Sequence, residues 1–326
     1  MPDLDHHTFD RLVSAGPRLP WIERWLLDDV WNRQRYEEQS KLQYLKNGEA
    51  EVNALEEVIS AAAPRVHDEL TAPPSLERDL RPFLDEQRPC AAVVFDGLSV
   101  RELPALLALA EQSHHSVRQV GVALAAMPAE TIDYVDQRLR AGRVAPTQLP
   151  SRRELRDGGV VAYYYDNPNQ RHQLEADADA LLLWSSFPDS TYRDSGARFP
   201  QHFEQLHTIL ETAWVNTVQQ VPAGRQVLVT SDHGYVYFGA GLSFPRSNAE
   251  LRPLNRYLRG ERFRRLSDGD EPPPDHPDLA VYRDRDIAVL RGRVQTHPPG
   301  PSSAGLYKHG GLSLMEMLTP WLVLEA

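Results

Sequence analysis

The 326-residue chain has one cysteine and no long apolar run. A single cysteine cannot form an intramolecular disulfide, which excludes a disulfide-stapled secreted fold and favours a reducing, cytoplasmic compartment. Cys90 precedes an apolar stretch, where a buried structural role is expected. No segment approaches the roughly 20 apolar residues of a membrane span, and the acidic N-terminus lacks the apolar core of a signal peptide. We therefore expect neither export nor a membrane partner.

Positive charge is also in short supply, because 35 Lys and Arg face 46 Asp and Glu, giving a net charge of −11. This balance argues against charge-driven nucleic-acid binding over the whole surface. One stretch differs, since residues 246–265 contain seven arginines and two glutamates. That basic stretch is a candidate for contacting a polyanion, although a solvated charged face is the commoner explanation. Hydrophobic residues make up 41% of the chain, enough for an extensive core.

The sequence predicts two regions. Residues 1–88 form an N-terminal helical region, because Trp, Leu and Val recur there at helical intervals among charged residues. We expect it to pack on the main domain or on a partner. Residues 89–326 alternate short apolar runs with helical patterns, as βαβ units do, and predict an α/β domain with a mostly parallel sheet flanked by helices. Residues 242–305, rich in Pro and Arg, interrupt this domain as a small β-rich insertion.

The expected strands occupy residues 91–96, 116–128, 179–189 and 226–234, with a last strand at the C-terminus. Helices are expected after Gly97, over about 198–220 and over 313–318. Ser99 and Glu102 have the spacing of a capping box at the start of the first of these helices, so Ser99 is expected to be a helix cap.

Three of these strands end in a carboxylate. Asp96 follows the first, Asp189 the third, and the pair Asp232-His233 the fourth, while the second runs into a turn that ends at Thr131. In open α/β sheets, ligands collect outside the carboxyl ends of the strands. Three unpaired carboxylates at one edge would repel one another, and divalent cations convert that repulsion into coordination. The pattern therefore indicates a metal site, although Asp-Gly turns also end strands without one.

The segments FDGLSVRE, MPAET, SSFPD, TSDHGY and YKHGGLSLMEMLTPW, in this order, resemble the PglZ domain, a branch of the alkaline phosphatase superfamily. The resemblance covers about residues 90–326. It implies a two-metal phosphohydrolase, with zinc as the usual metal. PglZ proteins belong to bacterial anti-phage systems of the BREX and phage-growth-limitation type, which implies other defence proteins as partners. The implied substrate is a phosphate ester, for which a nucleotide or nucleic acid is a candidate.

The resemblance also implies a role for each matching residue. Asp96, Asp232 and His233 would bind one metal together with Thr131, the nucleophile, whose hydroxyl becomes an alkoxide near neutral pH. Asp189 and His309 would bind the second metal. An alternative for Thr131 is an ordinary helix N-cap, a position compatible with binding a phosphate.

The sequence departs from the superfamily pattern at one position. Many members carry a histidine four residues after the third aspartate, whereas Arg193 stands at that distance from Asp189. Asp194 or His202 could substitute, or the second metal could be absent. The resulting alternative is a PglZ-like scaffold that acts by binding proteins, with at most one structural metal. A Ser-His-Asp hydrolase is not favoured, because the chain has no G-x-S-x-G motif.

Overall fold

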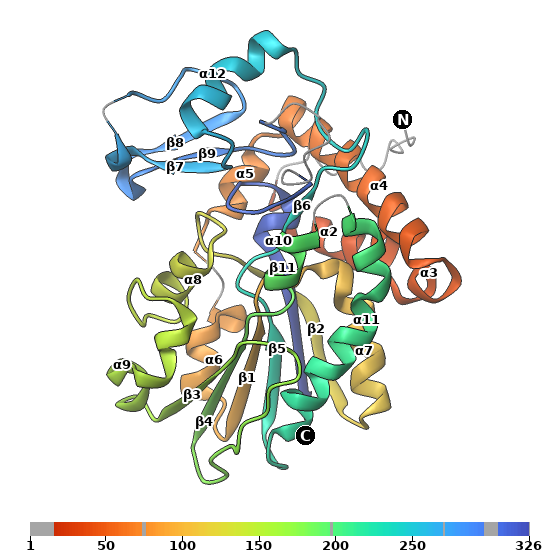
Figure 1. Ribbon diagram of the computed structural model, residues 1–326, viewed down its shortest axis with the longest axis vertical. Helices are drawn as coiled ribbons and strands as arrows, with labels where there is room; N and C mark the ends of the chain where they lie inside the picture. Colours follow the sequence, from red (N-terminus) through yellow and green to blue (C-terminus); the bar gives the residue numbers. More distant parts are fainter. Residues whose placement is uncertain (1–15, 74–75, 196–197, 270, 297–305, 326) are drawn as a thin grey trace.

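A six-stranded sheet with strand order β2-β11-β5-β1-β4-β3 forms the centre of the molecule (Figure 1). The computed structural model describes residues 16–73, 76–195, 198–269, 271–296 and 306–325, without the side chains of 76 and 193–195. The strands of this sheet are β1 (Cys90–Phe95), β2 (Ser116–Leu124), β3 (Val160–Tyr165), β4 (Ala180–Ser185), β5 (Gln226–Thr230) and β11 (Leu318–Glu325). The neighbours β5, β1, β4 and β3 pair in parallel, and β11 runs antiparallel to both β2 and β5. The predicted α/β class with a mostly parallel sheet is confirmed.

The strand direction determines where the site lies. Because β2 and β5 are both antiparallel to β11, the strands β1 to β5 all point the same way. Their carboxyl ends therefore meet at one edge of the sheet, as the sequence analysis required.

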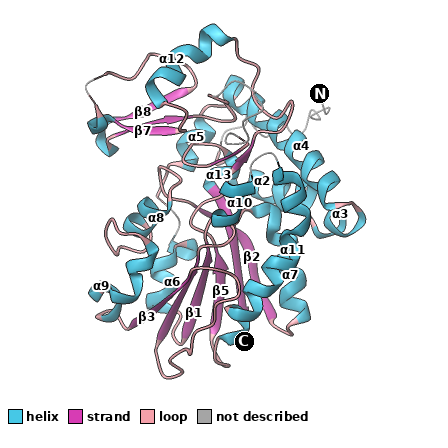
Figure 2. Cartoon of the chain, viewed as in Figure 1, coloured by secondary structure: helices cyan, strands magenta, loops and turns pink. Residues whose placement is uncertain are grey.

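The sheet is buried on both faces. Along β1, Ala91, Val93 and Phe95 belong to one hydrophobic cluster, and Cys90, Ala92 and Val94 belong to a second one on the opposite face. This alternation follows from the two-residue repeat of a strand and explains why β1 reads as a continuous apolar run. Figure 2 shows helices on both sides of the sheet.

The helices are short except for α4 and α11. Those before the first strand are α2 (Leu19–Arg24), the π-helical segment Trp25–Val30, α3 (Arg33–Glu38), α4 (Lys41–Ala62), α5 (Arg65–Leu70) and α6 (Leu80–Glu86). Those within the α/β domain are α7 (Leu103–Gln112), α8 (Thr131–Gln137), α9 (Arg153–Arg156), α10 (Asp189–Ser195), α11 (Phe199–Asn216) and α13 (Leu314–Met317). Nowhere in the described ranges is a helix both long and apolar enough to cross a membrane.

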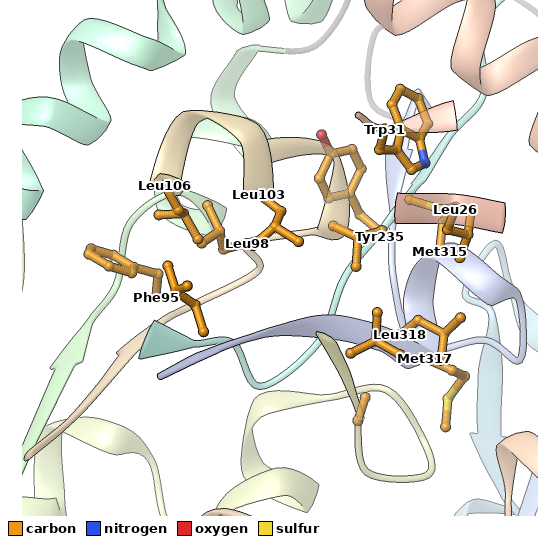
Figure 3. Close-up of a cluster of buried hydrophobic side chains, with 14 of the residues drawn as sticks. Leu26, Trp31, Phe95, Leu98, Leu103, Leu106, Tyr235, Met315, Met317 and Leu318 are labelled. Carbon is orange, nitrogen blue, oxygen red and sulfur yellow. The ribbon is translucent and has the colours of Figure 1, made fainter. Parts of the chain in front are cut away.

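The N-terminal helices share a core with the α/β domain. Leu26 and Trp31 lie in the same buried cluster as Phe95 and Met315. Figure 3 shows Leu26 and Trp31 near Tyr235. The helical character predicted for this region is confirmed over its described residues, whereas the boundary at residue 88 stays a prediction. The shared cluster also shows that the N-terminal helices pack on the α/β domain, which was one of the two predicted arrangements.

The insertion has a sheet of its own. The three strands β7 (Phe263–Arg265), β9 (Ile287–Leu290) and β8 (Leu279–Tyr282) pair antiparallel, beside helix α12 (Asn248–Leu258). Its small core includes Phe244, Leu254 and Leu290. The predicted β-rich character is confirmed, but α12 was not predicted, and residues 297–305 lie outside the described part.

Several arginines of the basic stretch have structural partners. Arg262 Nε and Nη2 lie 2.6 and 2.7 Å from the two carboxylate oxygens of Glu316, a buried pair that ties the insertion to α13. Arg246 makes a similar double contact with Asp278 at 2.7 and 2.9 Å. A stretch that reads as a single basic patch is therefore divided among separate, partly internal ion pairs.

Two further predictions need correction. The sequence analysis assigned no strand between residues 142 and 178, yet Val160–Tyr165 forms β3, and its β-branched and aromatic residues carried that signal. The helix predicted over 313–318 is only Leu314–Met317, capped by Ser313, because the chain enters β11 at Leu318.

Candidate metal centre

Six side chains predicted for the site meet at the carboxyl edge of the sheet. Asp96 follows β1, Thr131 begins α8 after β2, Asp189 begins α10 after β4, and Asp232-His233 follow β5. His309 comes from outside the sheet, directly after the short strand β10 (Tyr307–Lys308), which pairs with β6 (Val236–Tyr237).

The first group is formed by Asp96, Asp232 and His233, whose ligand atoms all lie within 4.8 Å of one another. His233 Nε2 lies 3.6 Å from Asp96 Oδ1 and 3.7 Å from Asp232 Oδ2. Asp232 and His233 are fully buried. This set of two carboxylates and one imidazole matches the donors that zinc and similar divalent cations bind.

The second group is formed by Asp189, His233 and His309, again within 4.8 Å. His309 Nε2 lies 3.7 Å from Asp189 Oδ1, and the two imidazoles stack with their centres 4.1 Å apart. His233 thus belongs to both groups, whereas the resemblance implied that it serves the first metal alone.

Main-chain carbonyls orient both imidazoles. His233 Nδ1 lies 3.0 Å from Gly234 O, and His309 Nδ1 lies 3.2 Å from Ala129 O. A carbonyl can only accept, so each Nδ1 carries a proton, and in the neutral ring Nε2 is then the nitrogen with the lone pair. The lone pairs face the carboxylates, which is the tautomer that metal coordination requires.

The buried carboxylate of Asp232 tests whether a cation fits. Its Oδ1 accepts a hydrogen bond from the Gly97 main-chain N–H at 3.0 Å. Its Oδ2 is buried without a hydrogen-bond partner. Such an oxygen is costly unless a positive charge compensates it. A divalent cation held by Asp232, Asp96 and His233 would satisfy it, so the residues fit the metal that the resemblance implies.

The hydroxyl of Thr131 lies beside the first group. Its Oγ1 is 3.4 Å from Asp96 Oδ1 and 3.4 Å from His233 Nε2. Thr131 is the first residue of α8, and Glu130 occupies the N-cap position, so the N-cap alternative for Thr131 is displaced by one residue. Ser99, by contrast, does cap its helical turn in a complete capping box with Glu102, as predicted.

Two residues of the site were missed by the sequence analysis. Tyr307 donates a hydrogen bond from its hydroxyl to Asp189 Oδ1 at 2.8 Å. Burial, and then the Asp189 charge, raise the pKa of Tyr307 well above 10, so the phenol stays a donor. Glu130 Oε1 lies 3.0 Å from His309 Nδ1. Glu130 precedes Thr131 in MPAET, and Tyr307 lies two residues before His309 in YKHGG. Their positions in these motifs were the sequence signal that could have identified them.

The proposed substitutes for the absent histidine are not all described. The side chains of Arg193 and Asp194 lie outside the described residues. His202 Nε2 is 2.9 Å from the hydroxyl of Thr191, and His202 belongs to neither of the two ligand groups found in the described chain. It is therefore engaged elsewhere than at the metal centre.

Comparison with known proteins gives distant similarities only. No family model matches the chain, and no curated protein matches it. Murine ectonucleotide pyrophosphatase/phosphodiesterase 5, in an inactive form in complex with AMP, shares 13% identity at a TM-score of 0.41, over 73% of this chain and 88% of that one. The human protein of the same name shares 12% sequence identity at a TM-score of 0.40, over 72% of this chain and 87% of that one. Phosphonoacetate hydrolase from Sinorhizobium meliloti 1021, in complex with phosphonoacetate, shares 13% sequence identity at a TM-score of 0.35, over 73% of this chain and 90% of that one.

Proposed function

We propose that the chain is a metal-dependent phosphoester hydrolase with Thr131 as its nucleophile. The observation that supports this most directly is the position of Thr131 Oγ1, 3.4 Å from both Asp96 Oδ1 and His233 Nε2. A hydroxyl beside a carboxylate and an imidazole that also fit a divalent cation is the arrangement of an activated alcohol nucleophile. The substrate class is a phosphomonoester or phosphodiester, and zinc is the metal that the donor set favours.

The ligands would be Asp96, Asp232 and His233 for one ion, with Asp189 and His309 for a second. A divalent cation bound there supplies positive charge that lowers the pKa of a nearby hydroxyl and stabilises charge on phosphoryl oxygens. The chain itself fixes the donors, since Gly97 N–H holds Asp232, Tyr307 holds Asp189, and main-chain carbonyls hold both imidazoles.

The reaction divides into two displacements at phosphorus. Thr131 Oγ1 forms a bond to phosphorus while the ester P–O bond breaks. The hydroxyl proton passes toward Asp96 Oδ1, 3.4 Å away, and then to the leaving alkoxide, which departs as an alcohol. Water then cleaves the phosphothreonine, releasing phosphate or a phosphomonoester and restoring Thr131. The resemblance to PglZ proteins supports a place in anti-phage defence, with a nucleotide or nucleic acid as substrate and other defence proteins as partners.

The nucleophile can be tested with two substitutions. Thr131→Ala should abolish hydrolysis of a p-nitrophenyl phosphodiester and monoester in the presence of zinc, whereas Thr131→Ser, which keeps the hydroxyl, should retain part of it. Thr212→Ala on α11, where Oγ1 only contacts Thr208 O, is the matched control and should match the parent. Unchanged turnover in Thr131→Ala would rule out the proposed nucleophile.

The alternative is a scaffold with one structural metal. It is favoured by one observation, that His233 is shared by both ligand groups, so the two groups cannot both be complete at once. Metal analysis of the purified chain distinguishes the two functions. About two ions per chain with turnover support the hydrolase, and one ion without turnover on any phosphoester supports the scaffold.

A further inference from the structure

A cavity is lined in part by residues of helix α8, whose first residue, Thr131, belongs to the metal centre. It has a volume of about 450 Å³ and is bounded by the end of β2, by α8, by the residues after α5, and by the insertion. Its charged lining consists of Arg138, Arg143, Arg265, Arg285, Asp133 and Asp136. Four guanidinium groups thus face two carboxylates, in a chain whose net charge is −11.

Two of these arginines share one acid. Arg143 Nη1 lies 2.6 Å and Arg265 Nη2 lies 2.5 Å from the same oxygen, Asp133 Oδ1. The Asp133 side chain is almost fully buried, so it anchors both guanidinium groups at the cavity wall. One negative charge is thereby divided between two positive ones.

The positive charges of the other two arginines have less negative charge near them. Arg138 Nη2 donates to Ala125 O at 2.7 Å, its Nε is buried without a hydrogen-bond partner, and no carboxylate of the described chain lies within 4.0 Å of it. Arg285 donates to Thr71 O at 3.1 Å, and its one ion pair in the described chain is a 3.9 Å contact with exposed Asp284. Burial lowers the pKa of Arg138, and the charge of Arg285 lowers it further, while Tyr134 and Asp79 act in the opposite direction.

The cavity is close to the proposed nucleophile. Arg138 follows Thr131 by seven residues on and just beyond α8, which corresponds to a separation of roughly 10 Å along the helix axis. Asp133, which anchors Arg143 and Arg265, is two residues from Thr131. A substrate that contacts both sites must therefore extend well beyond its scissile phosphate.

We propose that this arginine cavity binds a second phosphate group of the substrate, beyond the ester that is cleaved. The proposal rests on the proposed function, because it assigns the substrate an extended phosphodiester chain. Guanidinium groups bind phosphate oxygens through paired, charge-assisted hydrogen bonds, and a bound phosphate supplies the negative charge that Arg138 and Arg285 lack.

Binding is measured without catalysis, by anisotropy of a short fluorescein-labelled single-stranded oligonucleotide in EDTA. The test variant is the double substitution Arg143→Gln/Arg285→Gln, whose side chains are 47% and 40% exposed, so that folding is preserved. The matched control is Arg33→Gln/Arg118→Gln, which removes the same charge from side chains that are 48% and 58% exposed outside the cavity.

The test variant should bind about tenfold more weakly than the parent, and the magnitude of the slope of log affinity against log salt should fall by about 0.7, the value for one lost phosphate contact on a single strand. The control should match the parent, and tripolyphosphate should displace the oligonucleotide. Equal affinity of test and control variants, absence of binding by the parent, or failure of tripolyphosphate to compete would each overturn the proposal.

The same variants separate this proposal from the proposed function. The test variant should hydrolyse a small p-nitrophenyl phosphodiester as fast as the parent, because that substrate has no second phosphate. If the parent itself fails to hydrolyse it, the hydrolase assignment fails, whereas arginine-dependent binding in EDTA would still establish the cavity as a phosphate site.

Discussion

The Asp232→Asn variant should be more stable than the parent without metal and less stable than the parent when metal is bound. Asp232 is fully buried, with Oδ2 unpartnered, and its ligand atom lies within 4.8 Å of that of Asp96. At 4.8 Å and an effective dielectric constant of about 20, two unit charges repel by about 3 kcal/mol. Asn keeps an oxygen that can accept from the Gly97 N–H but removes the charge. In EDTA, the Asp232→Asn variant should therefore be more stable than the parent by about 2 kcal/mol, because solvent at the partly exposed Asp96 side chain screens part of the repulsion.

Metal should invert this result. A ligand present at a hundredfold excess over its dissociation constant stabilises the folded state by about 2.7 kcal/mol. The parent receives this stabilisation through its two carboxylates and imidazole, whereas the Asp232→Asn variant has lost an anionic ligand and should receive little of it. With zinc in excess, the parent should be the more stable protein.

The measurement is thermal unfolding of both proteins in EDTA and in excess zinc, where each change amounts to a few degrees. Asp79→Asn is the control, since Asp79 is also buried with an unpartnered oxygen, Oδ1, but belongs to neither ligand group. Its effect should be the same in both media. A parent whose unfolding temperature is indifferent to zinc, or a variant that ranks the same way in both media, would refute the electrostatic reasoning.

Three further outcomes follow from single residues. Burial raises the pKa of Glu56 to about 7, so the stability that this group contributes is fully present below its unfolded pKa near 4.5 and is lost as pH rises through 7. In chemical denaturation, Glu56→Gln should be more stable than the parent by up to about 3 kcal/mol at pH 8 and equally stable below pH 4.5. Tyr307→Phe removes the hydrogen bond to Asp189 and should weaken zinc binding about tenfold in a chelator competition titration, with the fold unchanged by circular dichroism. Gly234→Ala places a methyl group 2.1 Å from Met315 O and should destabilise the chain by about 2 kcal/mol in urea unfolding.

The parts of the site that could be predicted are those set by local sequence. Parallel strands deliver the residues that follow them to one edge, so Asp96, Asp189 and Asp232 could be placed together once their strands were recognised. His309 could be placed only through the resemblance, because the long insertion separates it from the sheet. The roles of these residues stay predictions until metal and turnover are measured.

The remainder depends on contacts between distant segments. Tyr307 bonds Asp189 across 118 residues, and Arg265 reaches Asp133 across 132, and no local pattern encodes either pairing. The basic stretch illustrates the same limit, since its arginines are adjacent in sequence but pair with acids from separate elements, such as Glu316 for Arg262. Three of the seven arginines, Arg246, Arg262 and Arg265, therefore pair with buried acids where the sequence indicated a single basic patch.

The distribution of buried charge supports a common account of the two sites. At one buried cluster in the core, opposite charges compensate one another: although burial acts to raise it, Arg101 and Arg293 together hold the pKa of Glu49 below its usual value. The metal centre, beside the first residue of the seven-residue helix α8, has a surplus of carboxylates. The arginine cavity, lined by later residues of the same helix, has a surplus of guanidinium groups. Uncompensated buried charge costs stability, so each surplus calls for a partner of the opposite sign. Cations at one site and a phosphate at the other would compensate both, and an extended phosphodiester bound across α8 would place its scissile group beside Thr131.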